Sequence, residues 1–395
     1  MIPLSGRTKP SGLTSPLRPD LWRVGAPGDP PASQPVACLV PDRDAMDGIV
    51  MPGHQLYLTH ASGAALPGPA LQLPTALRHL VPGDIIGVTS DGSRASVLWK
   101  STATHNSLLL TEQCDNYCLM CSQPPKERDD AWLFERAKEI ISLLPAGPHE
   151  LGLTGGEPSL HGDALIDLLE HCRDVAPQLR LHLLSNGRRF ADSAFSRRYA
   201  SVGLGDIMVG IPVYAAEAGR HDFIVQAAGA FDDTIRGILN LAALGQCVEI
   251  RIVVQRHTVP VLAELAEFIT RNLPFVDQVA LMGLEMTGLA RPNAAEVWID
   301  PADYQPELVE AARRLTGAGI VTKIYNHQLC VLDAELWPLA VRSISDWKND
   351  YLDACRDCAA KEACGGVFTT SGRRVSAHLR PLTLTELPER PAVSA

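Results

Sequence analysis

The chain has 395 residues, of which 46% are hydrophobic and 20% charged, and its formal net charge is −10. This acidic balance lacks the basic footprint that general nucleic-acid binding requires. No apolar run reaches the ~18 residues of a membrane-spanning helix, and residues 1–34 contain no signal-peptide core. We therefore expect a cytoplasmic protein with one large core and one or two small ones.

The composition and the apolar pattern of the N-terminal quarter change near residue 35. Residues 1–34 are rich in Pro, Gly and Ser without periodicity, which predicts a flexible segment. Residues 35–102 hold short apolar runs separated by turn signals such as Asp91-Gly92, which predicts a small β-rich domain. The patterns leave open whether this domain docks a partner or leader peptide or only stabilises the fold.

Apolar strands alternate with helical patterns over the next half of the chain, which is typical of βαβ units in an α/β fold with a parallel sheet. Two of the strands alternate apolar with polar side chains, for example Val248 and Ile250 with Glu249 and Arg251. A doubly covered parallel sheet is usually apolar on both faces, so an open barrel with a partly polar lumen is favoured over a wet edge strand. The expected strands are 107–112, 149–154, 179–185, 206–213, 247–256 and 276–284, and the expected helices are 131–144, 161–175, 191–202, 230–245 and 260–272.

Three cysteines, Cys114, Cys118 and Cys121, follow the first expected strand as C-x3-C-x2-C. A structural zinc site needs four ligands, and no fourth Cys or His lies within about the next twenty residues. A cuboidal four-iron cluster held by three thiolates instead leaves one iron open. The pattern favours such a cluster over three unrelated buried cysteines.

This spacing resembles that of the radical S-adenosylmethionine (AdoMet, or SAM) superfamily. The resemblance implies a partial (β/α)6 barrel over residues 103–300 and a catalytic cluster on Cys114, Cys118 and Cys121. In that family the open iron binds the amino and carboxylate groups of AdoMet. An electron from the cluster then generates a 5'-deoxyadenosyl radical that abstracts hydrogen from the substrate.

Further residues match the superfamily's AdoMet site. The run Gly155-Gly156-Glu157-Pro158 resembles its Gly-Gly-Glu-Pro motif, in which the glycines allow close approach and the acidic group receives the AdoMet amino group. Other expected AdoMet contacts are Ser185 and Asn186 after the third strand, Arg251 and Gln255 on the fifth, and Met120 beside the adenine, where the family often has an aromatic residue. Arg251 could pair with the AdoMet carboxylate or with Glu249 or Asp206.

Four further cysteines, Cys330, Cys355, Cys358 and Cys364, could hold either zinc or a second four-iron cluster. Their C-x2-C-x5-C core resembles the SPASM and twitch extensions of radical AdoMet enzymes, although a full SPASM set has more cysteines. The resemblance implies an auxiliary cluster in a C-terminal extension over 301–385, before a tail at 386–395. The remaining Cys38, Cys172 and Cys247 are expected to be small buried hydrophobes.

Residues 281–290, residues 343–349 and the Cys364-Gly-Gly end resemble the radical AdoMet maturases of the His-Xaa-Ser system, of the HxsC type. This implies an enzyme that modifies a ribosomally made peptide or small protein with His-Xaa-Ser repeats, beside a second radical enzyme and an external electron donor. Tyr214, His221, Glu285 and Thr287 are expected near the substrate. Two alternatives remain: a radical AdoMet enzyme acting on a small molecule, and a non-catalytic iron-sulfur or zinc module.

Overall fold

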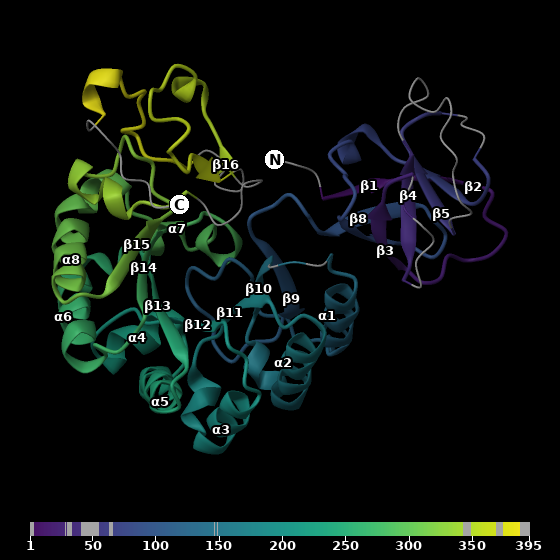
Figure 1. The fold of residues 1–395 in the computed structure, drawn as a ribbon. Helices are drawn as coiled ribbons and strands as arrows, with labels where there is room; N and C mark the ends of the chain where they lie inside the picture. The colour runs from purple at the N-terminus through teal and green to yellow at the C-terminus, as the bar shows by residue number, and fades with distance from the viewer. Residues whose placement is uncertain are drawn as a thin grey trace.

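Two large sheets, joined by residues 100–105, make up most of the described part of the chain (Figure 1). The structure, a computed structural model, describes residues 4–27, 29, 34–40, 55–62, 66–145, 147, 149–342, 349–368 and 374–387. An eight-stranded mixed sheet forms the N-terminal domain, and a seven-stranded parallel sheet forms the larger domain. Among the described residues, no helix combines the length and apolarity that a bilayer crossing requires.

The N-terminal sheet has the strand order β1-β8-β7-β3-β4-β5-β6-β2. The prediction of a flexible segment over residues 1–34 was wrong for its described part, because three of these strands precede residue 26. Leu21, Trp22 and Val24 of β3 are buried in the middle of the sheet, so a short apolar alternation outweighed the surrounding prolines. The strands are β1 Ser5–Arg7, β2 Lys9–Ser11, β3 Leu21–Gly25, β4 Val36–Val40, β5 Leu56–Thr59, β6 Ala70–Gln72, β7 Ile85–Val88 and β8 Arg94–Trp99.

The parallel sheet has the order β15-β14-β13-β12-β11-β10-β9 and is open between its two edge strands. The α/β fold with a partial barrel is confirmed, and all six predicted strands and five predicted helices are present. The strands are β9 Asn106–Thr111, β10 His149–Gly155, β11 Leu179–Leu184, β12 Ile207–Pro212, β13 Cys247–Val254, β14 Gln278–Gly283 and β15 Val321–Tyr325. The helices are α1 Trp132–Ser142, α2 Gly162–Val175, α3 Ser193–Ser201, α4 Ala218–Val225, α5 Ala230–Ala243, α6 Leu262–Asn272, α7 Ala294–Val297 and α8 Gln305–Gly317.

Strand β15 and helix α8 lie in the region predicted as a cysteine-rich extension, so the partial barrel has seven strands rather than six and continues to Tyr325. An edge strand half open to solvent has no continuous apolar pattern: Val321 is 54% exposed, and Lys323 is half-buried. This explains why the strand was not predicted.

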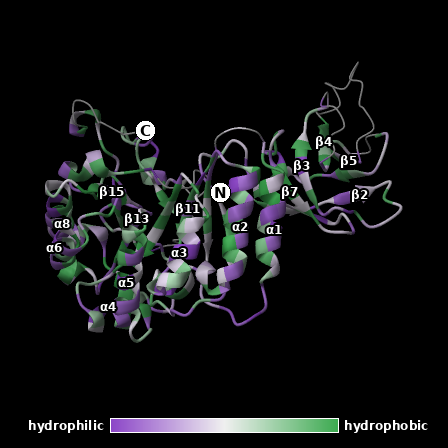
Figure 2. Ribbon diagram, turned by 60° about the horizontal axis from the view of Figure 1, so that its bottom comes forward, coloured by the Kyte–Doolittle hydropathy of each residue, from purple (hydrophilic) through white to green (hydrophobic). Residues whose placement is uncertain are grey.

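The two faces of the parallel sheet differ as the alternation predicted. On β13, Val248, Ile250 and Ile252 are buried in the main core with residues of α5 and α6. The intervening Arg251 and Val253 face a cavity in the lumen. Hydrophobic residues line the strands while hydrophilic residues mark the outer sides of helices such as α1 and α2 (Figure 2).

The C-terminal part is mostly irregular, with a short pair of strands, β16 Asn349–Asp350 and β17 Val367–Phe368. Residues 343–348 of the segment used for the His-Xaa-Ser resemblance, and residues 388–395 of the predicted tail, lie outside the described residues. Of the three remaining cysteines, Cys38 and Cys172 are buried as predicted. The prediction was wrong for Cys247, which is exposed at the beginning of β13.

The N-terminal domain should depend on one buried ion pair. The fully buried Asp84 carboxylate accepts hydrogen bonds from Lys100 Nζ at 2.8 Å and Ser101 N at 2.8 Å. Asp84→Ala leaves the lysine charge buried without its partner, so we expect unfolding by urea to become easier by about 3 kcal/mol. The control is Asp353→Ala, which removes a fully exposed ion pair with Arg356 and should change little. Equal effects of the two variants would contradict the assignment.

Candidate functional site

The first three cysteines line one cavity of about 300 Å³ at the carboxyl ends of the parallel strands. Chemistry in parallel barrels is concentrated at this end, where loops from many strands meet. Met120, Gly155, Gly156, Ser185, Asn186 and Arg251, all predicted as AdoMet contacts, line the same cavity. Glu157 and Gln255 do not.

The loop that carries these cysteines, residues 112–122, has no regular structure, and neighbouring elements hold its backbone. Tyr117 N and Leu119 N donate to the carbonyl oxygens of Val225 and Ile224 at the end of α4, at 2.9 and 3.0 Å. On the other side, Leu289 N donates to Cys121 O at 2.8 Å. Helix α4, which the sequence analysis did not predict, is therefore one of the elements that position the cysteines.

Gly288 packs directly against this loop. Its φ is +51°, and an added Cβ would lie 2.3 Å from Cys121 O and 2.6 Å from Ser122 O. Only glycine fits this combination of positive φ and close backbone approach. The segment 281–290, quoted for its family resemblance, thus holds the cysteine loop in place.

The two glycines after β10 are required mainly by packing within the chain. A Cβ on Gly155 would lie 2.4 Å from Thr111 O, and one on Gly156 would lie 2.0 Å from Gln113 O. Gly156 N donates to Thr111 O at 2.8 Å. The glycines let the end of β10 close against the beginning of the cysteine loop, and they line the cavity as well.

Glu157 is 1% exposed, and its carboxylate is bonded inside the protein. It accepts hydrogen bonds from Ser159 N at 3.0 Å, Ser159 Oγ at 2.6 Å and Ser185 Oγ at 2.9 Å, and from Asn186 N. Burial raises the pKa of this carboxyl, while the hydrogen bonds act in the opposite direction. Glu157 therefore joins the ends of β10 and β11, and the structure does not place its carboxylate in the cavity.

The turn after β11 also fixes the cysteine loop. Asn186 Nδ2 donates to Asp115 Oδ1 at 2.6 Å, and Arg188 Nη1 donates to Asp115 O at 2.9 Å and to Asn116 Oδ1 at 3.1 Å. Sequence reasoning missed Arg188 and Asp115, although Arg188 directly follows the Ser-Asn-Gly turn that it singled out. Both residues carry polar side chains next to segments predicted to bind a ligand, and this position was the signal that could have identified them.

Arg251 forms an ion pair with Glu249, one of the partners considered. Its Nη1 lies 2.5 Å from Glu249 Oε1, and its Nη2 lies 3.1 Å from Met282 Sδ. Burial opposes ionisation of Glu249, but the hydrogen bond with His182 and the charge of Arg251 hold its pKa at about 2. Asp206, the other protein partner considered, pairs with Arg180 instead. Arg251 still lines the cavity, and the carboxylate of Glu249 compensates its charge.

Gln255 lies away from the cavity. It is fully buried, and its Oε1 accepts a hydrogen bond from His257 N at 3.0 Å in the turn after β13. The inward alternation predicted for β13 ends with the strand at Val254, which is why the prediction does not extend to Gln255.

The residues expected near the substrate divide into two groups. Tyr214 and Glu285 line the cavity. His221 lies behind Tyr214, with stacked rings 5.8 Å apart, and its Nδ1 accepts from Tyr214 N at 3.3 Å. Thr287 does not line the cavity, and its N donates to Glu285 O at 2.9 Å. Asn116 and Asn326 are lining residues that sequence reasoning missed.

Residues 108–269 match the model of the Radical SAM superfamily. The chain carries a radical SAM domain. A domain of this superfamily implies a site for a four-iron cluster and AdoMet. No curated protein matches the chain in sequence.

Several solved structures resemble the radical SAM domain at low identity. Streptococcus suis SuiB bound to its precursor peptide SuiA matches with 12% identity and a TM-score of 0.45, over 57% of this chain and 49% of that one. AdoMet-bound anSMEcpe matches with 14% identity and a TM-score of 0.44, over 56% and 63% of the two chains. A radical SAM methyltransferase from Sphaerobacter thermophilus matches with 15% identity and a TM-score of 0.43, over 63% and 75%. The chain matches about half the length of the SuiB structures.

The residues of the radical SAM domain fit a cluster with one open iron. Three soft thiol donors face one cavity, and the described residues that line it include no other Cys and no His that could close the site. Among the described residues, no three His, Cys, Asp or Glu side chains converge as ligands of a single metal ion would. A four-iron cluster differs in this respect, because its thiolates bind separate iron atoms.

Burial opposes ionisation of these thiols. It raises the pKa of Cys114 to about 12 and also raises those of Cys118 and Cys121, and the neighbouring sulfurs add to the rise at Cys118. Thiolates at this place require compensating positive charge, which bound iron provides.

The structure also brings the four C-terminal cysteines together. Cys330, Cys355, Cys358 and Cys364 surround a cavity of about 20 Å³ with an apolar lining. Backbone N–H groups point at two of the sulfurs: Leu382 N lies 3.3 Å from Cys358 Sγ, and Gly366 N lies 3.4 Å from Cys364 Sγ. Such N–H groups stabilise metal-bound thiolates. Cys330, the cysteine most distant in sequence from the other three, lies in the same lining.

Gly288→Ala should disturb the cysteine loop of the radical SAM domain. The new Cβ meets two backbone carbonyls at an unfavourable φ, and we expect local strain of ~1–3 kcal/mol. The measurement is iron bound per chain after anaerobic reconstitution, which should fall. The control is Gly205→Ala, where an added Cβ meets nothing within 4 Å. Full iron content in Gly288→Ala would contradict this account.

The stability of the domain should fall as the pH is lowered from 7 to 5. Burial lowers the pKa of both His221 and His327 to about 4 from an ordinary value of 6.5. The unfolded chain therefore binds protons first as the pH falls below 6.5, which favours unfolding. Each histidine should reduce the unfolding free energy by on the order of 2 kcal/mol at pH 5. His221→Gln should show a smaller loss in urea unfolding at the two pH values, whereas an unchanged loss would contradict the assignment.

Proposed function

We propose that the protein reductively cleaves AdoMet and uses the resulting radical to modify a ribosomally made peptide or small protein. The observation that carries the first part is the cavity at the strand ends, into which three thiols face with no fourth Cys or His among the described lining residues. A four-iron cluster held by these thiols would supply the electron for reductive cleavage of AdoMet.

The chain's own residues would hold and shield the reactants. Cys114, Cys118 and Cys121 would bind the cluster. Ser185 and Asn186, which are fixed by Glu157 and Asp115, would present polar groups to AdoMet at the mouth of β11. Arg251 would contribute a fork of donors whose charge Glu249 already balances. We propose these roles on the basis of placement in the cavity.

Met120 and Tyr214, which line the cavity, belong to a buried apolar cluster. Met120, Tyr214 and Met286 form a buried cluster that Cys118 and Leu119 pack against. This apolar cluster would exclude water from the cavity. A reactive carbon radical requires such exclusion. Met120 would supply the apolar surface beside the adenine in place of an aromatic ring.

A peptide substrate is proposed from the His-Xaa-Ser resemblance. Of the segments that carry it, residues 281–290 contribute Leu284 and Glu285 to the cavity and hold the cysteine loop through Leu289 and Gly288. This placement supports a role in the site itself for that segment. The proposed partners are a small protein with His-Xaa-Ser repeats, a second radical enzyme of the same system and an external electron donor.

The four C-terminal cysteines are proposed to hold an auxiliary four-iron cluster rather than zinc. Their common cavity and the N–H donors to sulfur support a metal-thiolate site. The chemistry that such a cluster would supply is acceptance of the electron left over when a substrate radical forms a crosslink or is oxidised.

AdoMet cleavage tests the first part of the proposal. Reconstituted protein incubated with AdoMet and dithionite should release 5'-deoxyadenosine, and Cys118→Ala should release none, because two thiolates cannot hold the cluster. Cys172→Ala, a buried cysteine outside both groups, is the matched control and should keep the activity. Absence of cleavage by the loaded wild-type protein would favour the non-catalytic module.

Metal analysis tests the auxiliary site. Wild-type protein should bind two four-iron clusters, and Cys358→Ala should lose the iron of about one cluster while the AdoMet-dependent spectroscopic signal of the other persists. Zinc at these cysteines, with iron for a single cluster, would exclude the electron-accepting role.

Modification of the substrate is tested by co-expressing the enzyme with the small repeat protein. Mass spectrometry of the small protein should then show a mass loss on the scale of hydrogen atoms.

A further inference from the structure

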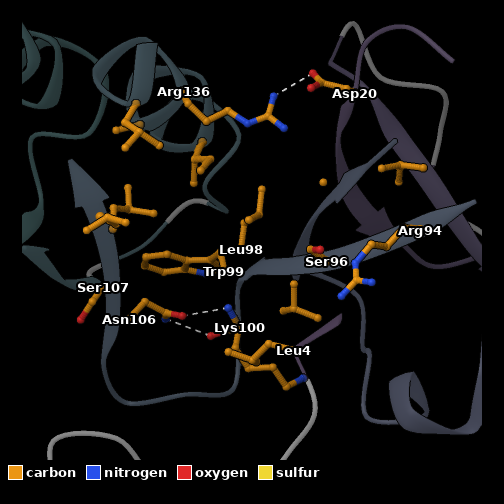
Figure 3. A pocket seen from close by; sticks show the side chains of 18 of the residues that line it. Leu4, Asp20, Arg94, Ser96, Leu98, Trp99, Lys100, Asn106, Ser107 and Arg136 are labelled. Atoms are coloured by element: carbon orange, nitrogen blue, oxygen red, sulfur yellow. Dashed lines mark hydrogen bonds and ion pairs between the residues drawn. The ribbon is translucent and has the colours of Figure 1, made fainter. Parts of the chain in front are cut away.

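A second cavity, of about 530 Å³, lies between the N-terminal domain and the radical SAM domain (Figure 3). We name it the interdomain groove. Strands β8 and β9 form two of its walls and helix α1 forms a third. The ion pair between Asp20 and Arg136, at 2.8 Å, connects the two domains beside it.

The groove runs along the open edge of β9. Side chains of a strand alternate between its two faces, yet four consecutive residues of β9, 106–109, line the groove. A cavity can meet both faces in succession only along the edge of a strand. β9 is the end strand of the parallel sheet, so alternate backbone N–H and C=O groups on this side have no neighbouring strand to bond in the part of the chain that the structure describes.

The groove also follows the end of β8. Consecutive residues 96–100 line it, and Leu98 is the extra residue at an irregularity in the pairing of β8 with β7. The two strand edges are held in place by reciprocal bonds: Lys100 N donates to Asn106 Oδ1 at 2.9 Å, and Asn106 Nδ2 donates to Lys100 O at 3.0 Å (Figure 3). Hydrogen bonds between the two strands therefore fix the shape of the interdomain groove.

The wall of the groove is largely apolar. Leu98, Trp99 and Leu108 contribute to it from the strands, and Leu133 and Ile140 contribute from α1. At its side, Trp132 is 60% exposed, which is unusual for so large an apolar ring. An open strand edge beside an apolar wall is the arrangement that binds extended polypeptides.

Among the described residues, Arg94 is a cation of the groove that has no acidic partner. Lys100 is paired with Asp84, and Arg136 with Asp20. Arg94 lines the groove and donates to Ser5 Oγ at 2.8 Å, but no carboxylate lies within salt-bridge distance among the described residues. The complementary ligand therefore carries a carboxylate as well as apolar side chains.

We propose that the interdomain groove binds an extended segment of the substrate polypeptide, which adds as a strand along β9 with an acidic residue at Arg94. The inference rests on the proposed function, since it names where the substrate docks. β9 ends at Thr111, three residues before Cys114, so a segment lying on β9 is directed toward the mouth of the radical site. The N-terminal domain thus supplies half of a docking slot.

The role of the Arg94 charge is tested by measuring how tightly the recombinant small repeat protein binds to the reconstituted enzyme. Arg94→Glu should weaken this binding by about tenfold, because a repulsion replaces an attraction. Arg78→Glu makes the same charge change at another exposed position of the N-terminal domain, outside the groove, and should leave the affinity unchanged. Both variants should still cleave AdoMet under dithionite, which shows that the radical SAM domain is intact.

Two further measurements test whether the substrate segment lies along β9. p-Benzoyl-phenylalanine at Ser107, on the groove, should crosslink to the small protein, whereas the same group at Val321, on the opposite edge strand β15, should not. Amide hydrogen exchange of residues 107–109 should slow in the complex, as strand addition requires. Contact through side chains alone would leave it unchanged.

The outcomes separate the two proposals. If the small protein binds and is modified but neither Arg94→Glu nor the Ser107 crosslink behaves as expected, the groove proposal is wrong and the function stands. A crosslink from Ser107 to the chain's own residues 1–3 would likewise overturn it, since Leu4 lines the groove. If the small protein docks at Ser107 but keeps its mass with the loaded enzyme, the proposed function fails and the groove stands.

Discussion

The site depends on a loop that has no secondary structure of its own. Every buried backbone group in such a loop needs a partner, because an unpaired N–H or C=O costs free energy. Here the partners come from three directions: the carbonyl oxygens at the end of α4, the backbone around Gly288, and Arg188 with Asn186 after β11. The loop can therefore present three thiols without a fourth ligand to fix them.

The strands and helices around this loop could be predicted because their patterns are local. The alternation of Val248 and Ile250 with Glu249 and Arg251 depends only on the pleat, so it gave both the strand and the face of the lumen. Edge elements are less visible: β15 and β3 are short, and their apolar pattern is interrupted by Lys323 or Arg23. What they add to the core is decided by neighbours distant in sequence.

Residues at the site could be named from motifs, but their partners could not. Glu157 was expected at a ligand, yet its carboxylate is occupied by Ser159, Ser185 and Asn186. Which groups surround a buried carboxylate depends on how two adjacent strand ends meet in space. For Arg251, sequence reasoning left two protein partners open. The pleat of β13 places Glu249 on the same face two residues earlier, and Asp206 pairs with Arg180 instead.

The two cysteine sites are joined by a short piece of chain. Asn326, which follows β15, lines the first cavity, while Gln328 and Cys330 line the second. Asn326 has a φ of +63° and turns the chain sharply, and Asn326 O approaches the position of Gly283 so closely that a Cβ there would lie 2.5 Å away. The next residue, His327, is buried and bonded to Tyr304 at 2.9 Å, so the connection is rigid. The turn after β15 thus contributes residues to both cavities, a role that the weak sequence pattern of this edge strand did not indicate.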